Sequence, residues 1–426
     1  MMAKRRSWVG LGIVVAGVMP LVAQQSGPQE RPVFRADAPG VEVDVRVFGR
    51  DSRFLDTLQR EDFVVLEDGV PQLITAMTLV GGSPTSALAS VSPAQPGGLA
   101  ANSAATAQQT WIFVFDLNHL TPGGGFSRAR SAVEAHLRDG FKDGDIGGVV
   151  AGSTMVNNRL TSVREELVAA VASVKPKSDQ RSRLIELTRE WPRLRDESEA
   201  LTIASGNRDA LQRATLRACT DDPTACRVVA PDALLLEKAQ RTQREAARAS
   251  LDTLNALNAL ASGLARRPGP KTVVLLSDGF VTADLETTLR TVVGQFTRAG
   301  ARLYAIDVRG LNRGAAAGIG DQMSPDDPAG GGARFDLGED GPNSLAVDTG
   351  GFVVRNENNI GRALAEIAVD ANTYYVLGYQ PANSNFDGKY RAIEVRVRDQ
   401  AGVVVRVRAR RGYLALKPAK ILRDRP

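Results

Sequence analysis

The sequence predicts an α/β protein with a doubly wound, mainly parallel sheet and a smaller antiparallel β module beside it. In the middle of the chain, short runs that are apolar throughout alternate with helical patterns. This alternation is typical of a parallel sheet that helices cover on both faces. A long helical segment interrupts it. Near both ends of the chain, apolar and polar residues alternate with a period of two, which indicates half-buried antiparallel strands.

Length and composition are those of a globular protein. The chain has 426 residues, of which 43% are hydrophobic and 24% charged, so it can form a main core and a smaller module. Residues 389–426 carry twelve Lys or Arg and three Asp or Glu. Such a basic tail could contact nucleic acid or anionic lipid. Because its arginines alternate with valines, we favour a solvated strand face and expect no nucleic-acid partner.

The N-terminus has the pattern of an export signal. Three basic residues at positions 4–6 precede an apolar run over residues 8–22, and the small residue Ala23 follows. Residues 1–23 are therefore predicted to be a cleaved signal peptide. A retained anchor is the alternative, although the run is short for a bilayer span. We expect a periplasmic or secreted mature protein without a transmembrane segment.

The first part of the mature chain predicts a small β module over residues 38–80. Residues 41–47 alternate strictly, residues 63–66 form a short apolar run, and an Asp-Gly turn follows over residues 67–71. Residues 81–109 are mostly Gly, Ser, Ala, Pro, Thr and Gln. Such a segment buries too little apolar surface to fix one conformation, so we interpret it as a flexible linker.

Residues 110–371 are predicted to form the central α/β domain. The sequence predicts buried strands at residues 112–115, 146–150, 273–276, 303–306 and 352–354, and helices after Ser127 and over residues 164–174 and 360–369. Ser127 is expected to cap the first helix. Residues 310–345 are dense in Gly, Pro, Asp and Ala, which favours a loop.

Residues 176–265 are predicted to be a helical insertion into this domain. Residues 233–264 are rich in Ala, Leu, Arg and Glu, which are good helix formers. The insertion contains Cys219 and Cys226, the only cysteines of the chain. In an oxidising compartment this pair is expected to form a disulfide that closes a short loop. Without histidines nearby, the two cysteines make a poor zinc site.

The C-terminal segment, residues 372–416, returns to β structure. Ile393, Val395 and Val397 alternate with charged residues, a turn follows at 399–402, and valines alternate again over residues 403–407. This pattern predicts a β-hairpin. Because the N-terminal module has few strands, we expect the two terminal segments to form one sandwich-like domain.

Three stretches together carry a family resemblance. They are residues 61–72, residues 271–279 ending in Ser-Asp-Gly, and residues 373–379 with Arg-Gly-Tyr at 411–413. In this order they resemble the von Willebrand factor type A (VWA) superfamily, in particular its secreted "VWFA-related" members of the acidobacterial type. The resemblance covers nearly all of the mature chain except the linker and the helical insertion.

The resemblance implies a metal-ion-dependent adhesion site that has partly decayed. In A domains the motif Asp-x-Ser-x-Ser follows the first strand and, with a Thr and a second Asp, holds Mg²⁺ or Mn²⁺. Here Asp116 is retained, Asn118 replaces the first Ser, and Leu120 replaces the second. Thr121 could substitute only by a shift of one residue. Asp278 matches the last acidic ligand, whereas the Thr ligand has no clear match.

The metal ligands implied by this motif are Asp116, Asn118 and Asp278, which would hold Mg²⁺ or Mn²⁺ weakly or not at all. His119, next to Asn118, could ligate zinc. With no third nitrogen or sulfur ligand nearby, a structural or solvated histidine is the favoured interpretation. His136 lies beside the apolar stripe of a predicted helix and is expected to be a packing residue.

Two functions are consistent with the sequence. The favoured one is an exported VWA-like protein-binding or adhesion module without catalysis, whose protein partner is unknown. The alternative is a divalent-cation-dependent hydrolase using Asp116 and Asp278. The Asp-x-Asn order is similar to the Asp-x-Asp of haloacid dehalogenase-type phosphatases, but Asn118 cannot donate a proton as an acid. No Gly-x-Ser-x-Gly elbow or P-loop occurs, and residues 123–125 are expected to make a loose glycine turn.

Overall fold

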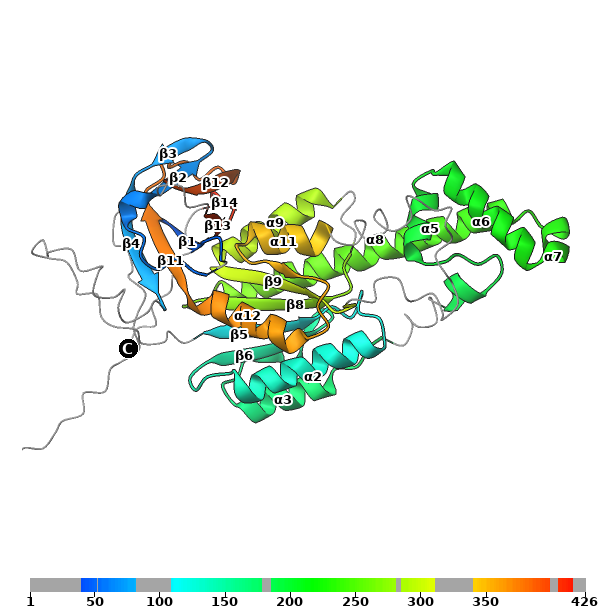
Figure 1. The fold of residues 1–426 in the computed structure, drawn as a ribbon, viewed down its shortest axis with the longest axis horizontal. Coiled ribbons are helices and arrows are strands. Elements are labelled where there is room, and N and C mark those ends of the chain that lie inside the picture. The colour runs from blue at the N-terminus through cyan, green and yellow to red at the C-terminus, as the bar shows by residue number, and fades with distance from the viewer. Residues whose placement is uncertain are drawn as a thin grey trace, which may run out of the picture.

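The computed structural model describes residues 40–51, 53–81, 109–177, 185–280, 285–310, 340–398 and 405–416. The predicted signal peptide and most of the predicted linker lie outside these ranges. The described residues form a central α/β body, a β sandwich at one end of it, and a helical lobe beyond the other end (Figure 1).

The body is built on a six-stranded sheet with the order β10-β9-β8-β5-β6-β7. Its strands are β5 (Thr110–Phe115), β6 (Ile146–Ala151), β7 (Thr154–Met155), β8 (Lys271–Ser277), β9 (Ala301–Asp307) and β10 (Val353–Val354). All neighbours pair in parallel except β6 and β7. Every residue of β5, β8 and β9 is buried, as a sheet covered on both faces requires. The predicted mainly parallel sheet is therefore confirmed.

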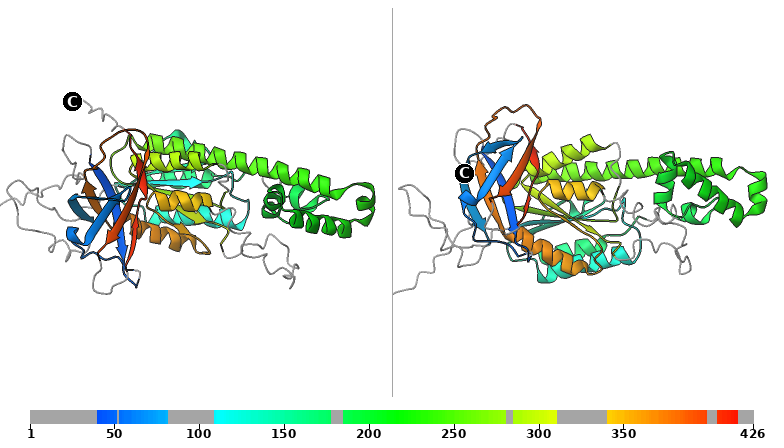
Figure 2. Two further views of the ribbon diagram at one scale, coloured as in Figure 1. Left: turned by 90° about the horizontal axis from the view of Figure 1, so that it is seen from above. Right: turned by 45° about the horizontal axis from the view of Figure 1, so that its top comes forward.

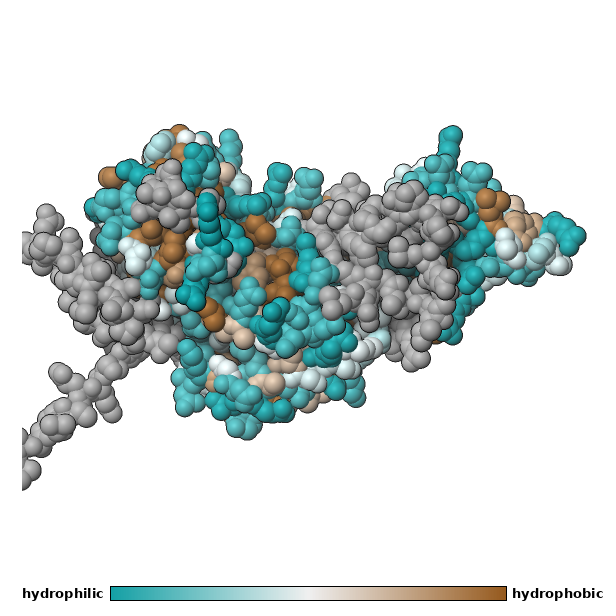
Figure 3. Space-filling model, in the orientation of Figure 1, coloured by the Kyte–Doolittle hydropathy of each residue, from teal (hydrophilic) through white to brown (hydrophobic). Residues whose placement is uncertain are grey.

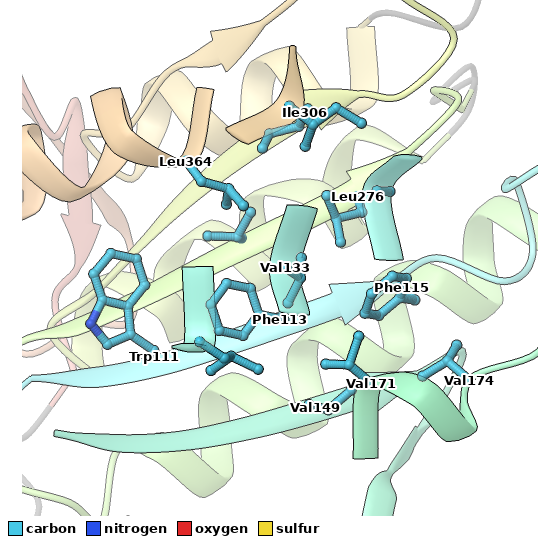
Figure 4. Packing of buried hydrophobic residues seen from close by; sticks show 14 of the residues in the cluster. Trp111, Phe113, Phe115, Val133, Val149, Val171, Val174, Leu276, Ile306 and Leu364 are labelled. Carbon is cyan, nitrogen blue, oxygen red and sulfur yellow. The ribbon is translucent and has the colours of Figure 1, made fainter. Parts of the chain in front are cut away.

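Helices cover both faces of this sheet. One face packs against α2 (Gly124–Asp139), α3 (Arg164–Ser173) and α12 (Ile360–Asn372), and the other against α9 (Glu286–Arg298), α11 (Asp340–Asp348) and the C-terminal part of α8 (Pro231–Leu264). Figure 4 shows the first core, in which Phe113 and Phe115 of β5 lie among Val133 of α2, Val171 of α3 and Leu364 of α12. His136 packs edge-on against Trp111 and Phe113, as expected for a packing residue.

The start of α2 differs from the sequence prediction. The helix begins at Gly124, so Ser127 lies within its first turn and is not the N-cap. A Cβ atom on Gly125 would lie 2.7 Å from the carbonyl oxygen of Val308, at the end of β9. The predicted loose glycine turn is therefore wrong for Gly125, which lies in the helix and lets its first turn approach the sheet closely.

The loop predicted for residues 310–345 is also shorter at its C-terminal end, because α11 already begins at Asp340. Residues 311–339 lie outside the described residues.

The sandwich consists of two four-stranded antiparallel sheets. One has the order β13-β1-β11-β4, with β13 (Arg406–Ala409), β1 (Val41–Phe48), β11 (Tyr374–Tyr379) and β4 (Ile74–Val80). The other has the order β14-β12-β2-β3, with β14 (Gly412–Leu414), β12 (Tyr390–Val397), β2 (Phe63–Glu67) and β3 (Val70–Gln72); a short 3-10 helix, Arg60–Asp62, precedes β2. One core joins the sheets and includes Val45, Phe63, Leu377 and Ile393. Both sheets thus combine N-terminal and C-terminal strands.

The predicted C-terminal hairpin is wrong. β12 pairs with β2 and β14, whereas β13 pairs with β1, so the two strands lie in different sheets. Val397 and Val407 still pack against the same core. Alternation records only which face of a strand is buried, and it is satisfied equally well by two strands that face each other across a sandwich.

A buried ion network joins the sandwich to the body. Arg46 of β1 is 0% exposed, and its Nε lies 2.9 Å from Asp370 Oδ2 on α12. Asp370 also accepts hydrogen bonds from Arg408 Nη1 of β13, at 2.6 Å, and from the Tyr304 hydroxyl of β9, at 2.7 Å. The Arg46 guanidinium lies over the Tyr374 ring, 4.9 Å from its centroid. One carboxylate therefore ties together strands of the sandwich and elements of the body.

The helical insertion forms a lobe on the N-terminal half of α8. The lobe includes the helices α5 (Glu197–Ala204), α6 (Arg208–Asp221) and α7 (Pro223–Val228). Each follows an N-cap residue whose side chain accepts backbone hydrogen bonds, namely Asp196, Asn207 and Asp222. The lobe has its own core, which includes Ile203, Ala214 and Leu235. Because α8 has 34 residues, it is about 50 Å long, and it carries the lobe well away from the sheet (Figure 2).

The predicted disulfide between Cys219 and Cys226 is present and links α6 to α7. A disulfide is compatible with an exported protein. Of the helices in the described part of the chain, none has the length and apolar character needed to cross a membrane. Figure 3 shows apolar residues near the free end of the lobe. In this lobe, Leu216 of α6 is 62% exposed and Val228 of α7 is 81% exposed.

Replacing both Cys219 and Cys226 by Ser should loosen the lobe and leave the sheet unaffected. Closing so short a loop is worth about 2–3 kcal/mol at most, and the lobe core is separate from the cores on the sheet. Amide hydrogen exchange should therefore accelerate in α6 and α7 but not in β8. Faster exchange in β8, or no change in α6, would contradict this expectation.

Candidate functional site

The candidate site lies at the carboxyl edge of the central sheet. Asp116 directly follows β5, and Ser277 and Asp278 end and follow the adjacent strand β8. From β5 the chain continues to β6 on one side and, after the lobe, to β8 on the other. Strand order reverses here, and in open α/β sheets such a switch point is where binding sites occur.

Both oxygens of the Asp116 carboxylate have hydrogen-bond partners within the protein. Its Oδ1 accepts the Thr253 hydroxyl of α8 at 2.8 Å, and its Oδ2 accepts the Ser277 hydroxyl at 2.8 Å. His119 Nδ1 also lies 2.8 Å from Oδ2. The Asp116 side chain is only 1% exposed. Protein groups therefore occupy both carboxylate oxygens.

A tight turn after β5 brings His119 back over Asp116. The amides of His119 and Leu120 both donate to the carbonyl oxygen of Asp116. Leu120, at the position where the resemblance expects a second Ser, is 0% exposed and packs in the core below the edge. This position therefore contributes to packing and supplies no oxygen.

Asn118 is held between a hydroxyl and an ammonium group. Its Nδ2 donates to Thr253 Oγ1 at 3.0 Å, and its Oδ1 accepts from Lys177 Nζ at 2.5 Å. Lys177 comes from the segment after α3. Thr253 thus accepts from Asn118 and donates to Asp116, which joins the two residues in one network. We call Asp116, Asn118, His119, Lys177, Thr253 and Ser277 the Asp116 cluster.

Asp278 lies at the same edge but has a different partner. Its Oδ2 accepts the backbone amide of Thr121 at 2.8 Å. Burial raises the pKa of Asp278 to about 6. Of the three residues implied as metal ligands, Asp116 and Asn118 thus share Thr253, whereas Asp278 holds the turn that contains Thr121.

Opposite charges within the cluster favour each other. Burial alone would raise the pKa of Asp116, but the His119 ring and the hydroxyls of Thr253 and Ser277 outweigh it and lower this pKa. Burial alone would lower the pKa of His119, but the charge and hydrogen bond of Asp116 raise it. The charges of Glu197 and Asp278 raise it further, so the pKa of His119 lies above its usual value. The site thus favours an ion pair of carboxylate and imidazolium.

The sequence reasoning missed Thr253, Ser277 and Lys177. Ser277 could have been found, because it ends an apolar strand immediately before Asp278. Thr253 is a buried hydroxyl on the same helix face as Leu254 and Leu257, and such a residue on an apolar stripe signals a buried partner. Nothing in the local sequence distinguishes Lys177 from other exposed lysines.

The residues of the cluster do not fit a divalent cation. Mg²⁺ and Mn²⁺ need several oxygen ligands in near-octahedral geometry. Asp116 already accepts from three groups, the Asn118 carbonyl faces an ammonium, and Leu120 has no side-chain oxygen. Within the described ranges, no group of three or more His, Cys, Asp or Glu residues is placed to hold a metal ion.

Comparisons with known proteins add nothing to this geometry: no family model, no curated protein and no solved structure matches the chain.

Proposed function

We propose that this chain is an exported, VWA-like protein-binding module without catalytic activity. The observation that carries the proposal is the Asp116 cluster, in which a carboxylate at the switch point of the sheet is held by groups from α8, β8 and its own turn. An acidic residue after the central strand, a hydroxyl partner and a Ser-Asp-Gly strand end are the features that the family resemblance implies.

The hydrolase alternative is less well supported by this geometry. A nucleophilic or metal-holding carboxylate must reach its substrate or cation, but the Asp116 side chain is almost fully buried. The hydrogen bond between His119 Nδ1 and Asp116 engages this nitrogen within the cluster, and Asp116 raises the pKa of the ring. Asp278 is engaged by the Thr121 amide.

Exposed arginines at the same edge offer a surface for a protein partner. Arg128 in the first half of α2 donates to the carbonyl oxygen of Val308 at the end of β9, and Arg362 lies in the first turn of α12. Both are exposed. Arginine is favoured at protein interfaces because its planar group makes several hydrogen bonds at once. We therefore place the partner at this edge, beside the projecting part of α8.

The test is a capture experiment with the mature protein and an extract of the source's cell envelope. The double variant Arg128→Glu/Arg362→Glu should retain the partner at least about tenfold less well than the wild type. A partner surface that is complementary in charge to the arginines would be repelled by the glutamates. Arg138→Glu, in the last turn of α2 and therefore at the opposite edge, is the matched control and should retain it fully.

An activity assay accompanies the capture. Hydrolysis of p-nitrophenyl phosphate and p-nitrophenyl acetate should stay at the buffer rate with Mg²⁺ or Mn²⁺ present. Turnover that Asp116→Asn abolishes would support the hydrolase instead. If the wild type, the double variant and the Arg138→Glu control all retain the same partner equally well, the proposal that the partner binds at this edge is refuted.

A further inference from the structure

The Asp116 cluster places a nitrogen of the chain against an oxygen of Asp116 and another against the oxygen of Asn118. His119 Nδ1 lies 2.8 Å from Asp116 Oδ2, and Lys177 Nζ lies 2.5 Å from Asn118 Oδ1. Asp116 and Asn118 are the two neighbouring ligands implied by the family resemblance. A nitrogen of the chain thus lies within hydrogen-bond distance of a side-chain oxygen of each residue.

We propose that His119 and Lys177 replace the divalent cation at this edge, so that the edge is assembled without metal and closed to Mg²⁺ and Mn²⁺. The inference rests on the proposed function, because it concerns how the binding edge is held in shape. The Asp116 carboxylate in one hydrogen bond and the Lys177 ammonium in the other make both bonds charge-assisted, and such bonds are stronger than neutral ones.

The hydroxyl groups of the cluster are committed to the same network. Thr253 receives a hydrogen from Asn118 and gives its own to Asp116, and Ser277 gives its hydrogen to Asp116. Ser277 Oγ in turn accepts the amide hydrogen of Gly279 at 3.1 Å. A cation entering the cluster would have to displace these donors as well as the two nitrogens.

Leu120 removes the remaining ligand position. Its side chain is fully buried among core residues of the sheet and α2. A cation at Asp116 would therefore find the oxygens of Asp116 and Asn118 and no hydroxyl in place of Leu120. Mg²⁺ keeps several waters among its six oxygen ligands, but it still needs protein oxygens that are open to the ion.

The first test is calorimetric titration of the mature protein with Mn²⁺. The wild type should show no binding at about 5 mM Mn²⁺, and its thermal midpoint should be the same with Mg²⁺ as with EDTA, because only a ligand that binds the folded state shifts this midpoint. The double variant His119→Ala/Lys177→Ala should bind Mn²⁺ at least about tenfold more tightly than the wild type. Because the His119 ring contacts the buried Phe280, circular dichroism first checks that this variant folds.

The matched control is the same double variant with Asp116→Asn added, which should lose the gained Mn²⁺ binding. Wild-type binding of Mn²⁺ or Mg²⁺ that Asp116→Asn removes would overturn the proposal. So would a folded double variant that gains no binding.

If the double variant does not fold, the thermal midpoints of the wild type with and without Mg²⁺ still test the proposal. A shift of this midpoint by Mg²⁺ that Asp116→Asn removes would refute an edge assembled without metal. This test uses no partner and no substrate. Its failure is thus distinct from failure of the proposed function, which the capture and activity experiments decide.

Discussion

Replacing Asp370 by Ala should lower the free energy of unfolding by about 3–5 kcal/mol, because it leaves a buried cation without its counter-charge. Arg46 is 0% exposed and the Asp370 side chain only 4%. The substitution also removes the acceptor of Tyr304 and of Arg408. Urea unfolding followed by circular dichroism measures the loss, and the slope of the transition shows whether sandwich and body still unfold together.

Glu366→Ala is the matched control for this substitution. Glu366 lies one turn earlier on α12 and is exposed, so the free energy of unfolding should change by no more than about 0.5 kcal/mol. Adding Arg46→Met to Asp370→Ala should recover part of the loss, since no fully buried charge then lacks a partner. A loss below about 1 kcal/mol for Asp370→Ala would show that the network does not join the two units.

Asp116→Ala should have an effect of similar size, about 3–5 kcal/mol, measured by the same urea unfolding at neutral pH. The substitution removes the acceptor of the buried Thr253 and Ser277 hydroxyls and the carboxylate beside the His119 ring. A site that merely gathers carboxylates for a cation behaves differently, because removing one of them relieves repulsion between like charges.

Asp278→Asn is the informative comparison for Asp116→Ala. An amide oxygen can still accept the Thr121 backbone hydrogen, and burial already disfavours the charged form of Asp278, whose pKa is raised to about 6. We expect no loss of stability near neutral pH, or a small gain. Equal losses for the two variants, or an unchanged Asp116→Ala protein, would show that the Asp116 cluster does not hold the edge together.

Much of the fold could be predicted because burial patterns are local. The apolar runs at residues 112–115, 273–276 and 303–306 each became a strand buried on both faces. Alternation at residues 41–47 likewise marked β1. Backbone geometry repeats every two residues in a strand and every 3.6 in a helix, so the sequence carries these periods directly.

The same local patterns misled where the outcome depended on a distant partner. Ser127 has the right chemistry for a helix cap, but α2 begins earlier because Gly125 fits against Val308. The valines of β12 and β13 have the pattern of a hairpin, but each strand pairs with a strand from the N-terminal segment. The start of α2 and the pairing of β12 and β13 thus depend on contacts between residues far apart in the chain.

The sequence by itself determined the type of the main elements, the mainly parallel character of the central sheet and the disulfide pair. It also placed Asp116 and Asp278 directly after predicted strands. Only the tertiary structure decided what surrounds Asp116. Thr253 is 137 positions away from it and Ser277 161, and no period in the sequence connects such residues. Their meeting depends on how α8 and β8 pack, and that packing gives Asp116 hydrogen-bond donors in place of an open metal site.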